Sequence, residues 1–401
     1  MIKDLDKKIK AYALKNAIAH DGKANPGSVI SALFNEGLKK SEVKKVMTKI
    51  QEIIKDVETL SLEDQKKEFE DLDKVVSHRE TREGLEELPN SKKGVVMRFA
   101  PSPSGPMHIG HALTSCISFL YVKKYGGKFY LRIEDTNPEN IYKPAYKMID
   151  DEGKWLFDGI AKTIIQSDRM ELYYKYSKKL IDKKSAYICT CSQEAFKKFV
   201  DVKKNCPCRN LSVKKNIERW KKMLDDKGFE EGEAVLRFKS SMTHKNPAMR
   251  DFPLARVNLT PHPRQASKYR VWPLMNLAVA VDDIEMKMSH IIRAKDHRDN
   301  AERQKMIYSA LGIKKFPWTA FLGRIHFKDL ELSTTQFRQG IEKGIYSGWD
   351  DVKLPTLASL KKRGYKPQAF WKLSERIGLS ENDKVMDKKE FFLLLDDFNR
   401  V

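Results

Sequence analysis

The sequence predicts an α/β protein built on a parallel sheet, because strand, loop, helix and strand patterns follow one another between residues 94 and 136. GVVMRFA at 94–100 and KFYLRIEDT at 128–136 are typical of strands, and MHIGHALTSCISFLYVKKYG at 107–126 is typical of a helix. PSPSGP at 101–106 is predicted to be a loop, since its three prolines forbid regular structure. A strand, a crossover helix and a second strand form the repeating unit of parallel sheets.

The N-terminal residues 1–90 are predicted to be helical. Apolar residues recur at helical spacing along SEVKKVMTKIQEIIKDVETL, and Ser61 with Asp64 forms a candidate capping box for the next helix. LPNSKKG at 88–94 gathers proline, asparagine, serine and glycine, and therefore predicts a boundary.

Further elements are expected along the rest of the chain. EAVLRFK at 233–239 predicts a strand, and VWPLMNLAVAVDD at 271–283 predicts a buried segment that ends in a strand. A helix is expected near 298–311, and the chain from about 350 onward is expected to be helical and basic. A length of 401 residues indicates two to four domains.

The charge balance leaves two interpretations open. Lys and Arg number 76 against 55 Asp and Glu, a formal net charge of +21, which indicates either a well-solvated lysine-rich surface or a polyanionic partner such as nucleic acid. There is no apolar run of membrane-spanning length and no signal-peptide pattern at the start, so we expect a soluble, cytoplasmic protein without a membrane partner.

His108 and His111 lie three residues apart just after the proline-rich loop. A metal site would need a third ligand, and none follows within the next several residues, while a pair of core histidines remains the plain alternative. Their place between a strand and a helix favours a third interpretation. Unpaired backbone N–H groups and the positive end of the helix dipole meet anions there, and Gly110 would let a flat ring approach the backbone.

Four of the five cysteines form two close pairs. CTC and CPC contain Cys189, Cys191, Cys206 and Cys208. In a cytosolic protein such pairs indicate a metal, zinc above all, more than a disulfide, and free thiols on a hairpin are the alternative. Cys116 is expected to be a small core residue.

The stretch RFAPSPSGPMHIGHA at 98–112 resembles the signature of class I aminoacyl-tRNA synthetases of the glutamyl/glutaminyl branch, and the chain is most similar to their archaeal glutamyl type. The resemblance runs from about residue 5 to the end, and it is carried by GGKFYLRIEDTNP, QSDRMELYY, AYICTC, CPCR, VWPLMNLAVAVDD, HIIRAKDHRDN and YSGWDDVKLPTLASLKKRG. It implies a Rossmann-like catalytic domain at 91–190 and 271–330. It also implies an acceptor-end-binding insertion at 191–270 and a helical stem-contact region at 331–401 that includes a second ATP loop.

The resemblance implies a glutamate–tRNA ligase that uses ATP with Mg²⁺, L-glutamate and tRNA(Glu). It assigns glutamate binding to Arg98, Ser102, Glu134 and Arg293, with Arg293 reading the side-chain carboxylate and Glu134 taking the ammonium group. ATP binding is assigned to Pro103, His108, Gly110, His111, Ser333, Thr334 and Thr335. His108 and His111 are also assigned a catalytic role, the stabilisation of charge as pyrophosphate leaves. Some relatives carry zinc at the cysteine region, which contacts the tRNA acceptor end.

The second ATP loop, ELSTTQFRQG at 331–340, departs from the family pattern. Relatives have a lysine where this chain has Gln336, and we expect Arg338 to replace it as a catalytic cation, with Lys328 as a weaker substitute. KMSH at 287–290 is rejected as this loop because it precedes Arg293. Ile284 also stands where relatives have a histidine.

The chain ends where the family continues into anticodon-reading β-barrels, so we expect either a separate chain that supplies them or action without anticodon reading. Three alternatives to glutamate ligation stay open. They are a glutaminyl or other-acceptor ligase, a tRNA-binding paralogue with an impaired site, and half of a split enzyme. A small-molecule nucleotidyltransferase shares the histidine motif but not the flanking stretches.

Overall fold

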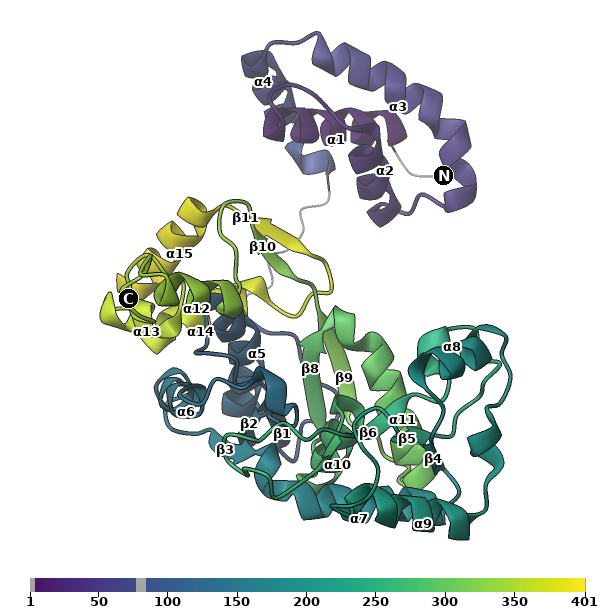
Figure 1. Cartoon of the computed structure of the whole chain (residues 1–401). Helices are drawn as coiled ribbons and strands as arrows, with labels where there is room; N and C mark the ends of the chain where they lie inside the picture. Colours follow the sequence, from purple (N-terminus) through teal and green to yellow (C-terminus); the bar gives the residue numbers. More distant parts are fainter. Residues whose placement is uncertain (1–3, 77–83, 401) are drawn as a thin grey trace. The chain divides into compact units, whose positions relative to one another are not determined.

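The computed structural model describes residues 4–76 and 84–400, and it divides the chain into two compact units, Met1–Arg82 and Glu83–Val401 (Figure 1). This division comes a few residues before the boundary predicted at 88–94. Leu88 is 5% exposed and packs in the main core of the second unit, and Ser91 is buried there as well. The further subdivision of the second unit into domains stays a prediction.

The first unit contains four α-helices in its described part: α1 (Leu5–Ala19), α2 (Pro26–Asn35), α3 (Val43–Glu58) and α4 (Leu62–Leu72). Ile50, Ile54 and Val57 of α3 are buried, as their helical spacing predicts. Ser61 caps α4 by accepting the backbone N–H of Asp64, which confirms its half of the predicted capping box. The Asp64 carboxylate accepts from the Ser61 hydroxyl instead of from the Ser61 backbone, so the reciprocal half is absent.

The second unit contains the predicted parallel sheet. β1 (Val95–Phe99), β2 (Gly127–Ile133) and β3 (Lys162–Ile165) pair in parallel, and α5 (Ile109–Tyr125) connects the first two. A second parallel pair, β8 (His290–Ala294) and β9 (Trp318–Leu322), lies on the other side of β1. Ser289 joins the two pairs, because its backbone N–H donates to Val96 O over 3.0 Å. The strands therefore run in the order β3, β2, β1, β8, β9.

The segment predicted as a buried strand before Arg293 is a helix instead. After the short strand β7 (Val271–Pro273), residues Met275–Glu285 form α10. Leu277 through Asp283 are all buried, so this stretch has no solvent-exposed face, and the apolar run from Leu277 to Val281 shows no helical alternation. A short segment that is apolar on every side cannot be distinguished from a buried strand by periodicity alone.

Between β3 and α10 the chain forms an antiparallel sheet with its own helices. β4 (Ala186–Cys189), β5 (Val235–Phe238), β6 (Pro253–Val257) and β7 pair in chain order. The helices of this part are α7 (Met170–Asp182), α8 (Gln193–Asp201) and α9 (Val213–Leu224). Trp272 of β7 is 1% exposed at the centre of the core that joins this sheet to α10.

The C-terminal part packs against α5. Its helices are α12 (Thr334–Glu342), α13 (Leu357–Lys362), α14 (Pro367–Ile377) and α15 (Lys388–Arg400), and β10 (Ile325–Phe327) pairs in parallel with β11 (Lys384–Met386). Phe370 and Leu373 of α14 share a core with Leu113 and Ile117 of α5. α6 (Ala145–Leu156) and α11 (Arg298–Leu311, as predicted) complete the helices. In the part of the chain that is described, none of the helices has the length and apolarity that crossing a membrane requires.

Two adjacent glycines lie at the start of β2, and at the second of them the backbone of β2 comes very close to that of β1. Gly127 has a φ of +125°, and a Cβ added there would lie 2.0 Å from the carbonyl oxygen of Val95. Gly126 also has a positive φ, +73°, but a Cβ there would meet nothing within 4 Å. The two positions therefore separate steric overlap from backbone strain.

We predict that Gly127→Ala destabilises the second unit by about 3 kcal/mol or more, because the methyl group overlaps β1 in addition to straining the backbone. Gly126→Ala is the control and should lose about 1–2 kcal/mol from strain alone. Denaturant unfolding of both variants measures the difference, and equal losses would contradict the close approach of the two strands.

Candidate active site

Three of the residues predicted to bind substrate gather at one edge of the parallel sheet. Arg98 lies near the carboxyl end of β1, Arg293 near that of β8, and Glu134 directly follows β2. From β1 the chain crosses to β2 on one side, while β8 lies on the other, so the strand order reverses between β1 and β8. Crevices at such a reversal are where open α/β sheets bind ligands.

His108 and His111 at the start of α5 adopt one defined tautomer. His108 Nδ1 accepts the N–H of Gly110 over 3.1 Å, and His111 Nδ1 accepts the N–H of His108 over 3.4 Å. A neutral imidazole whose Nδ1 accepts carries its proton on Nε2. The rings stack with centroids 3.8 Å apart, which leaves two Nε2–H donors side by side.

Burial keeps both histidines neutral. It lowers the pKa of His111 to about 4, and it holds the pKa of His108 well below its ordinary value, with a smaller contribution from His111. Near pH 7 the pair therefore offers neutral hydrogen-bond donors. Among the described residues, the cluster with metal-ligand geometry consists of cysteines and does not include this pair.

A cavity of about 710 Å³ opens in front of the histidines. His108, Gly110, His111 and Thr114 form one wall, and residues 322–332 with Ala294 form the other. Gly110 is a close approach, since a Cβ there would lie 3.2 Å from Leu332 Cδ1. His108 and His111 therefore line a cavity instead of packing inside a closed core, which excludes the interpretation that they are a pair of core histidines.

The backbone around His108 is held by a segment about 250 residues further along the chain. Ile109 N–H donates to Pro355 O over 3.0 Å, and Leu357 N–H donates to Met107 O over 2.9 Å. From α6, Glu152 accepts the N–H of Met107 over 2.7 Å, and burial raises the pKa of this carboxyl to about 8. Sequence reasoning missed these contacts because nothing in the local pattern of either segment signals them.

Behind the substrate edge lies a buried network of arginines and aspartates. Arg98 makes a bidentate pair with Asp283 (2.8 and 3.1 Å), and Arg132 binds both Asp283 (2.6 Å) and Glu134 (3.0 Å). Burial alone would raise the pKa of Asp283, but Arg98 and Arg132 hold it at about 2. Asp282 accepts from Arg169, Gln166 and Tyr173. The motif VDD was recognised in the sequence, but these two aspartates were given no role.

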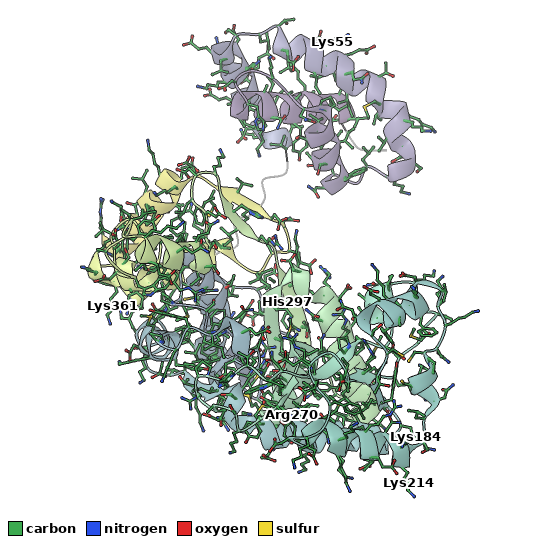
Figure 2. All side chains as sticks on the ribbon, in the orientation of Figure 1. Lys55, Lys184, Lys214, Arg270, His297 and Lys361 are labelled. Atoms are coloured by element: carbon green, nitrogen blue, oxygen red, sulfur yellow. The ribbon has the colours of Figure 1, made fainter. Side chains whose placement is uncertain are left out.

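Arg293 differs from the other arginines of the site. Its NH1 donates to Gln304 Oε1 over 2.8 Å, and its buried Nε has no hydrogen-bond partner. Burial, followed by repulsion from Arg98, lowers the pKa of Arg293 to about 10. His297, labelled in Figure 2, shares this environment, and burial and Arg293 lower its pKa as well. The guanidinium groups of Arg98, Arg132, Arg169 and Arg293 face the three carboxylates of Asp282, Asp283 and Glu134, which leaves one positive charge in excess.

The remaining predicted ATP residues lie around the cavity rather than in its lining. Thr334 touches the proline-rich loop, since a Cβ on Gly105 would lie 2.2 Å from its methyl group, and Ser333 caps α12. Thr335 and Ser102 are exposed, and Pro103 is buried with its carbonyl accepting the N–H of Tyr142.

The structure separates the two cations proposed for the second ATP loop. Arg338 lies 3.7 Å from Glu342 in an ion pair and is not part of the cavity lining. Lys328 is part of the lining, and its ammonium group has no hydrogen bond or ion pair with any described residue. Gln336 is exposed and donates to Glu331 over 3.0 Å.

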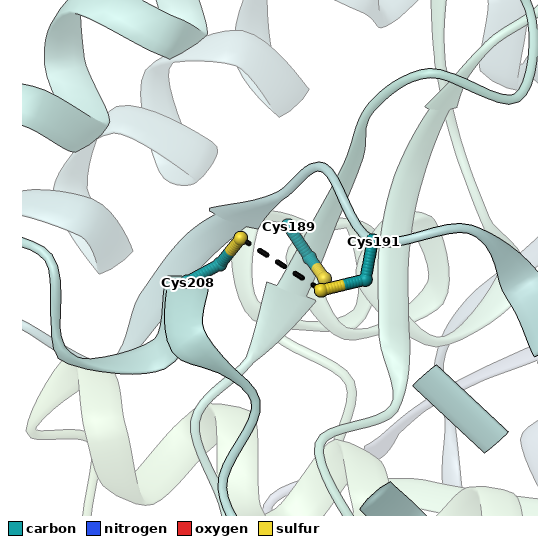
Figure 3. Close-up of side chains that lie close together, drawn as sticks. All are labelled: Cys189, Cys191 and Cys208. Carbon is teal, nitrogen blue, oxygen red and sulfur yellow. Dashed lines mark hydrogen bonds between the residues drawn. The ribbon is translucent and has the colours of Figure 1, made fainter. Parts of the chain in front are cut away.

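Three of the four clustered cysteines converge at the end of β4 (Figure 3). The Sγ atoms of Cys189, Cys191 and Cys208 lie within 4.8 Å of one another. Cys206 adjoins the group, with its Sγ 3.9 Å from that of Cys189, and hydrogen bonding with Cys189 lowers the pKa of Cys206 to about 5. Cys116 is fully buried in α5, as predicted.

Comparison with known proteins identifies the family. The family model described as tRNA synthetases class I (E and Q), catalytic domain, matches residues 94–396. A glutamate–tRNA ligase of Methanocaldococcus jannaschii is 45% identical over 380 residues, which are 94% of this chain and 68% of the relative. One from Methanothermobacter marburgensis is 42% identical over 98% of this chain and 70% of the relative.

A solved structure shares the fold. The glutamate tRNA ligase from Elizabethkingia meningosepticum, crystallised in complex with its amino acid, matches with a TM-score of 0.53 and 21% identity over 75% of this chain and 68% of that one. At this identity the likeness concerns the fold alone, which agrees with the predicted Rossmann-like sheet. The relatives and the family model together decide the assignment: the chain belongs to the class I tRNA synthetases of the E and Q group.

Proposed function

We propose that this protein is a glutamate–tRNA ligase, which activates L-glutamate with ATP to glutamyl adenylate and transfers it to the 3′-terminal adenosine of tRNA(Glu). The observation that carries the proposal is the position of the under-partnered Arg293. The residue that follows it, Ala294, lines the same cavity as His108 and His111. An arginine proposed to bind a carboxylate and two hydrogen-bond donors proposed to bind phosphate therefore share one site.

The charge of the site is complementary to glutamate. Glutamate carries two carboxylates and one ammonium group, hence a net charge of −1, and the buried groups around it carry one positive charge in excess. We assign the side-chain carboxylate to Arg293 and the ammonium group to Glu134. Asp283 occupies the Nε and NH2 atoms of Arg98, which leaves NH1 free for the α-carboxylate, and Ser102 is assigned a lesser contact.

The histidines serve the ATP phosphates. Their two Nε2–H donors and the positive end of the α5 dipole suit an anion. The backbone N–H groups of His108, Ile109 and Gly110 already have partners, so the imidazoles supply the donors at this helix start. Mg²⁺ on the ATP phosphates would neutralise part of their charge. The protein's own contribution is to position the α-carboxylate against the α-phosphorus and to stabilise the departing pyrophosphate.

The basic surface suits a tRNA partner. The net charge of +21 attracts a polyanion over long range, and lysines are exposed in separate parts of the second unit, among them Lys184, Lys214 and Lys361, which Figure 2 labels. Because the proposed substrate is tRNA, we also propose that the protein works in the cytoplasm. A separate chain that carries an anticodon-binding domain stays a prediction.

We predict ATP–pyrophosphate exchange that depends on glutamate and tRNA, and formation of glutamyl-tRNA by the purified chain. Arg293→Gln should raise the KM for glutamate at least about tenfold, since a charge-assisted hydrogen bond is lost. Parallel assays with glutamine distinguish the glutaminyl alternative. No exchange with any tRNA supplement would contradict the proposal.

The second candidate function is a tRNA-binding protein with an impaired ATP site, and Gln336 is the observation that favours it. A lysine in this loop would balance charge on the departing pyrophosphate. We propose that Lys328 provides this charge instead, because it lines the cavity opposite the histidines and has no partner among the described residues. The family-based assignment to Arg338 has less support, since that side chain pairs with Glu342.

We predict that Lys328→Gln lowers the kcat of exchange about 10- to 100-fold, while Arg338→Gln, the control, changes it less than threefold. Gln336→Lys should raise kcat and should restore much of the loss in the Lys328→Gln background. Single-turnover formation of glutamyl adenylate measures the chemical step. An equal loss of kcat in Lys328→Gln and Arg338→Gln would argue against Lys328. A large gain from Gln336→Lys in an otherwise inactive chain would favour the impaired-site candidate.

We propose that the cysteine cluster binds zinc. Tetrahedral zinc with sulfur ligands at about 2.3 Å requires sulfur atoms about 3.8 Å apart. The separations of 3.9 Å between Cys189 and Cys206 and 4.0 Å between Cys191 and Cys208 fit that requirement. The ion would tie the end of β4 to the turn at 206–208, a part of the chain with few other buried side chains.

We predict one zinc ion for each purified chain and its loss in Cys208→Ser, together with a lower melting temperature. Because the metal is proposed to be structural, chelation should reduce tRNA charging by disordering the region around Cys189. Cys116→Ala, in the core of α5, is the matched control and should keep the zinc. Elemental analysis decides the matter, and a metal-free wild-type chain that charges tRNA fully would refute the site.

A further inference from the structure

Gln304 is a buried, uncharged partner of the arginine that we assign to the substrate side chain. It lies on α11, is 1% exposed, and accepts Arg293 NH1 over 2.8 Å. The neighbouring Arg98 and Arg132 both pair with carboxylates. Arg293 is thus the guanidinium of this site whose direct partner in the described chain is neutral.

A chain of side-chain amides fixes the orientation of Gln304. Its Nε2 donates to Asn276 Oδ1 over 3.3 Å, and Asn276 Nδ2 donates to Asn300 Oδ1 over 3.3 Å. Arg303 NH1 also donates to Asn300 Oδ1, over 2.9 Å. Because each oxygen already faces a donor, the Gln304 amide cannot rotate by 180° without placing its NH2 group against a guanidinium.

A neutral acceptor has a particular electrostatic consequence. It orients the guanidinium through one N–H while leaving its full positive charge for another group. A carboxylate in the same position would cancel that charge, as Asp283 does for Arg98. The buried Nε of Arg293, which has no partner, remains for an incoming oxygen.

We infer that Gln304 is a specificity-determining positioning residue, which directs Arg293 toward the side chain of the amino acid substrate and keeps its charge uncompensated, so that the carboxylate of glutamate is preferred to the amide of glutamine. The inference rests on the proposed function and deepens it. Gln304 acts through Arg293 and need not touch the substrate.

The test is Gln304→Glu in the full-length protein, assayed by ATP–pyrophosphate exchange with tRNA and with either glutamate or glutamine. The new carboxylate would pair with Arg293 and remove the excess charge. We expect the KM for glutamate to rise about 10- to 100-fold with a smaller change in kcat. The ratio of glutamate to glutamine kcat/KM should fall by at least tenfold.

Two further variants separate positioning from folding. Gln304→Met keeps the side-chain volume but removes the acceptor, so it should raise the KM for glutamate without any gain for glutamine. Gln51→Glu makes the same chemical change on the exposed surface of α3 and should leave both substrates unaffected. If Gln304→Glu does not fold, the Gln304→Met result decides, and an unchanged KM for glutamate in that variant overturns the inference.

The outcomes also distinguish this inference from the proposed function. A wild-type chain that activates neither amino acid would refute the proposed function itself. A wild-type chain that activates glutamate, with a folded Gln304→Glu variant whose KM and substrate ratio stay within twofold, would refute the role of Gln304 alone. An equal fall of kcat for both amino acids with unchanged KM values would show a merely structural residue.

Discussion

The bidentate pair between Arg98 and Asp283 is the contact on which the site depends. It joins β1 to α10, and Arg132 of β2 binds the same carboxylate, so two strands and one helix meet at one buried aspartate. Burying an ion pair costs desolvation free energy, and only several well-directed hydrogen bonds offset that cost. Here those bonds orient Arg98 and keep Asp283 ionised, and the substrate edge of the sheet is assembled around them.

The chemistry of the site follows from unequal compensation of charge. Arg98 of β1 and Arg132 of β2 share the carboxylate of Asp283, and Arg132 also pairs with Glu134, while Arg293 of β8 receives only an amide. The histidines differ from these arginines, because burial keeps His108 and His111 uncharged at the start of α5. The one surplus positive charge of this network therefore lies at Arg293, while the cavity beside the histidines offers uncharged hydrogen-bond donors on one wall and Lys328 on the other.

The C-terminal part is a structural component of the cavity at His108 and His111 rather than an appendage. Pro355 and Leu357 hold the backbone on either side of His108, and residues 322–332 form the facing wall of the cavity. Any ligand that shifts this part would also act on the histidines, because the hydrogen bonds are direct.

The sequence by itself determined the parallel sheet, the cap at Ser61, the helix at 298–311 and the histidine and cysteine motifs. In each of these cases the decisive residues are neighbours in the chain, so spacing and local chemistry are enough. The family resemblance added Arg98, Glu134 and Arg293. Only the tertiary structure decided that 275–285 is a helix, that Lys328 rather than Arg338 lines the cavity, and that Glu152, Asp283 and Gln304 hold the functional groups. Those residues act across long separations in the chain, and a buried polar side chain carries no sign in the sequence of the partner that folding will bring to it.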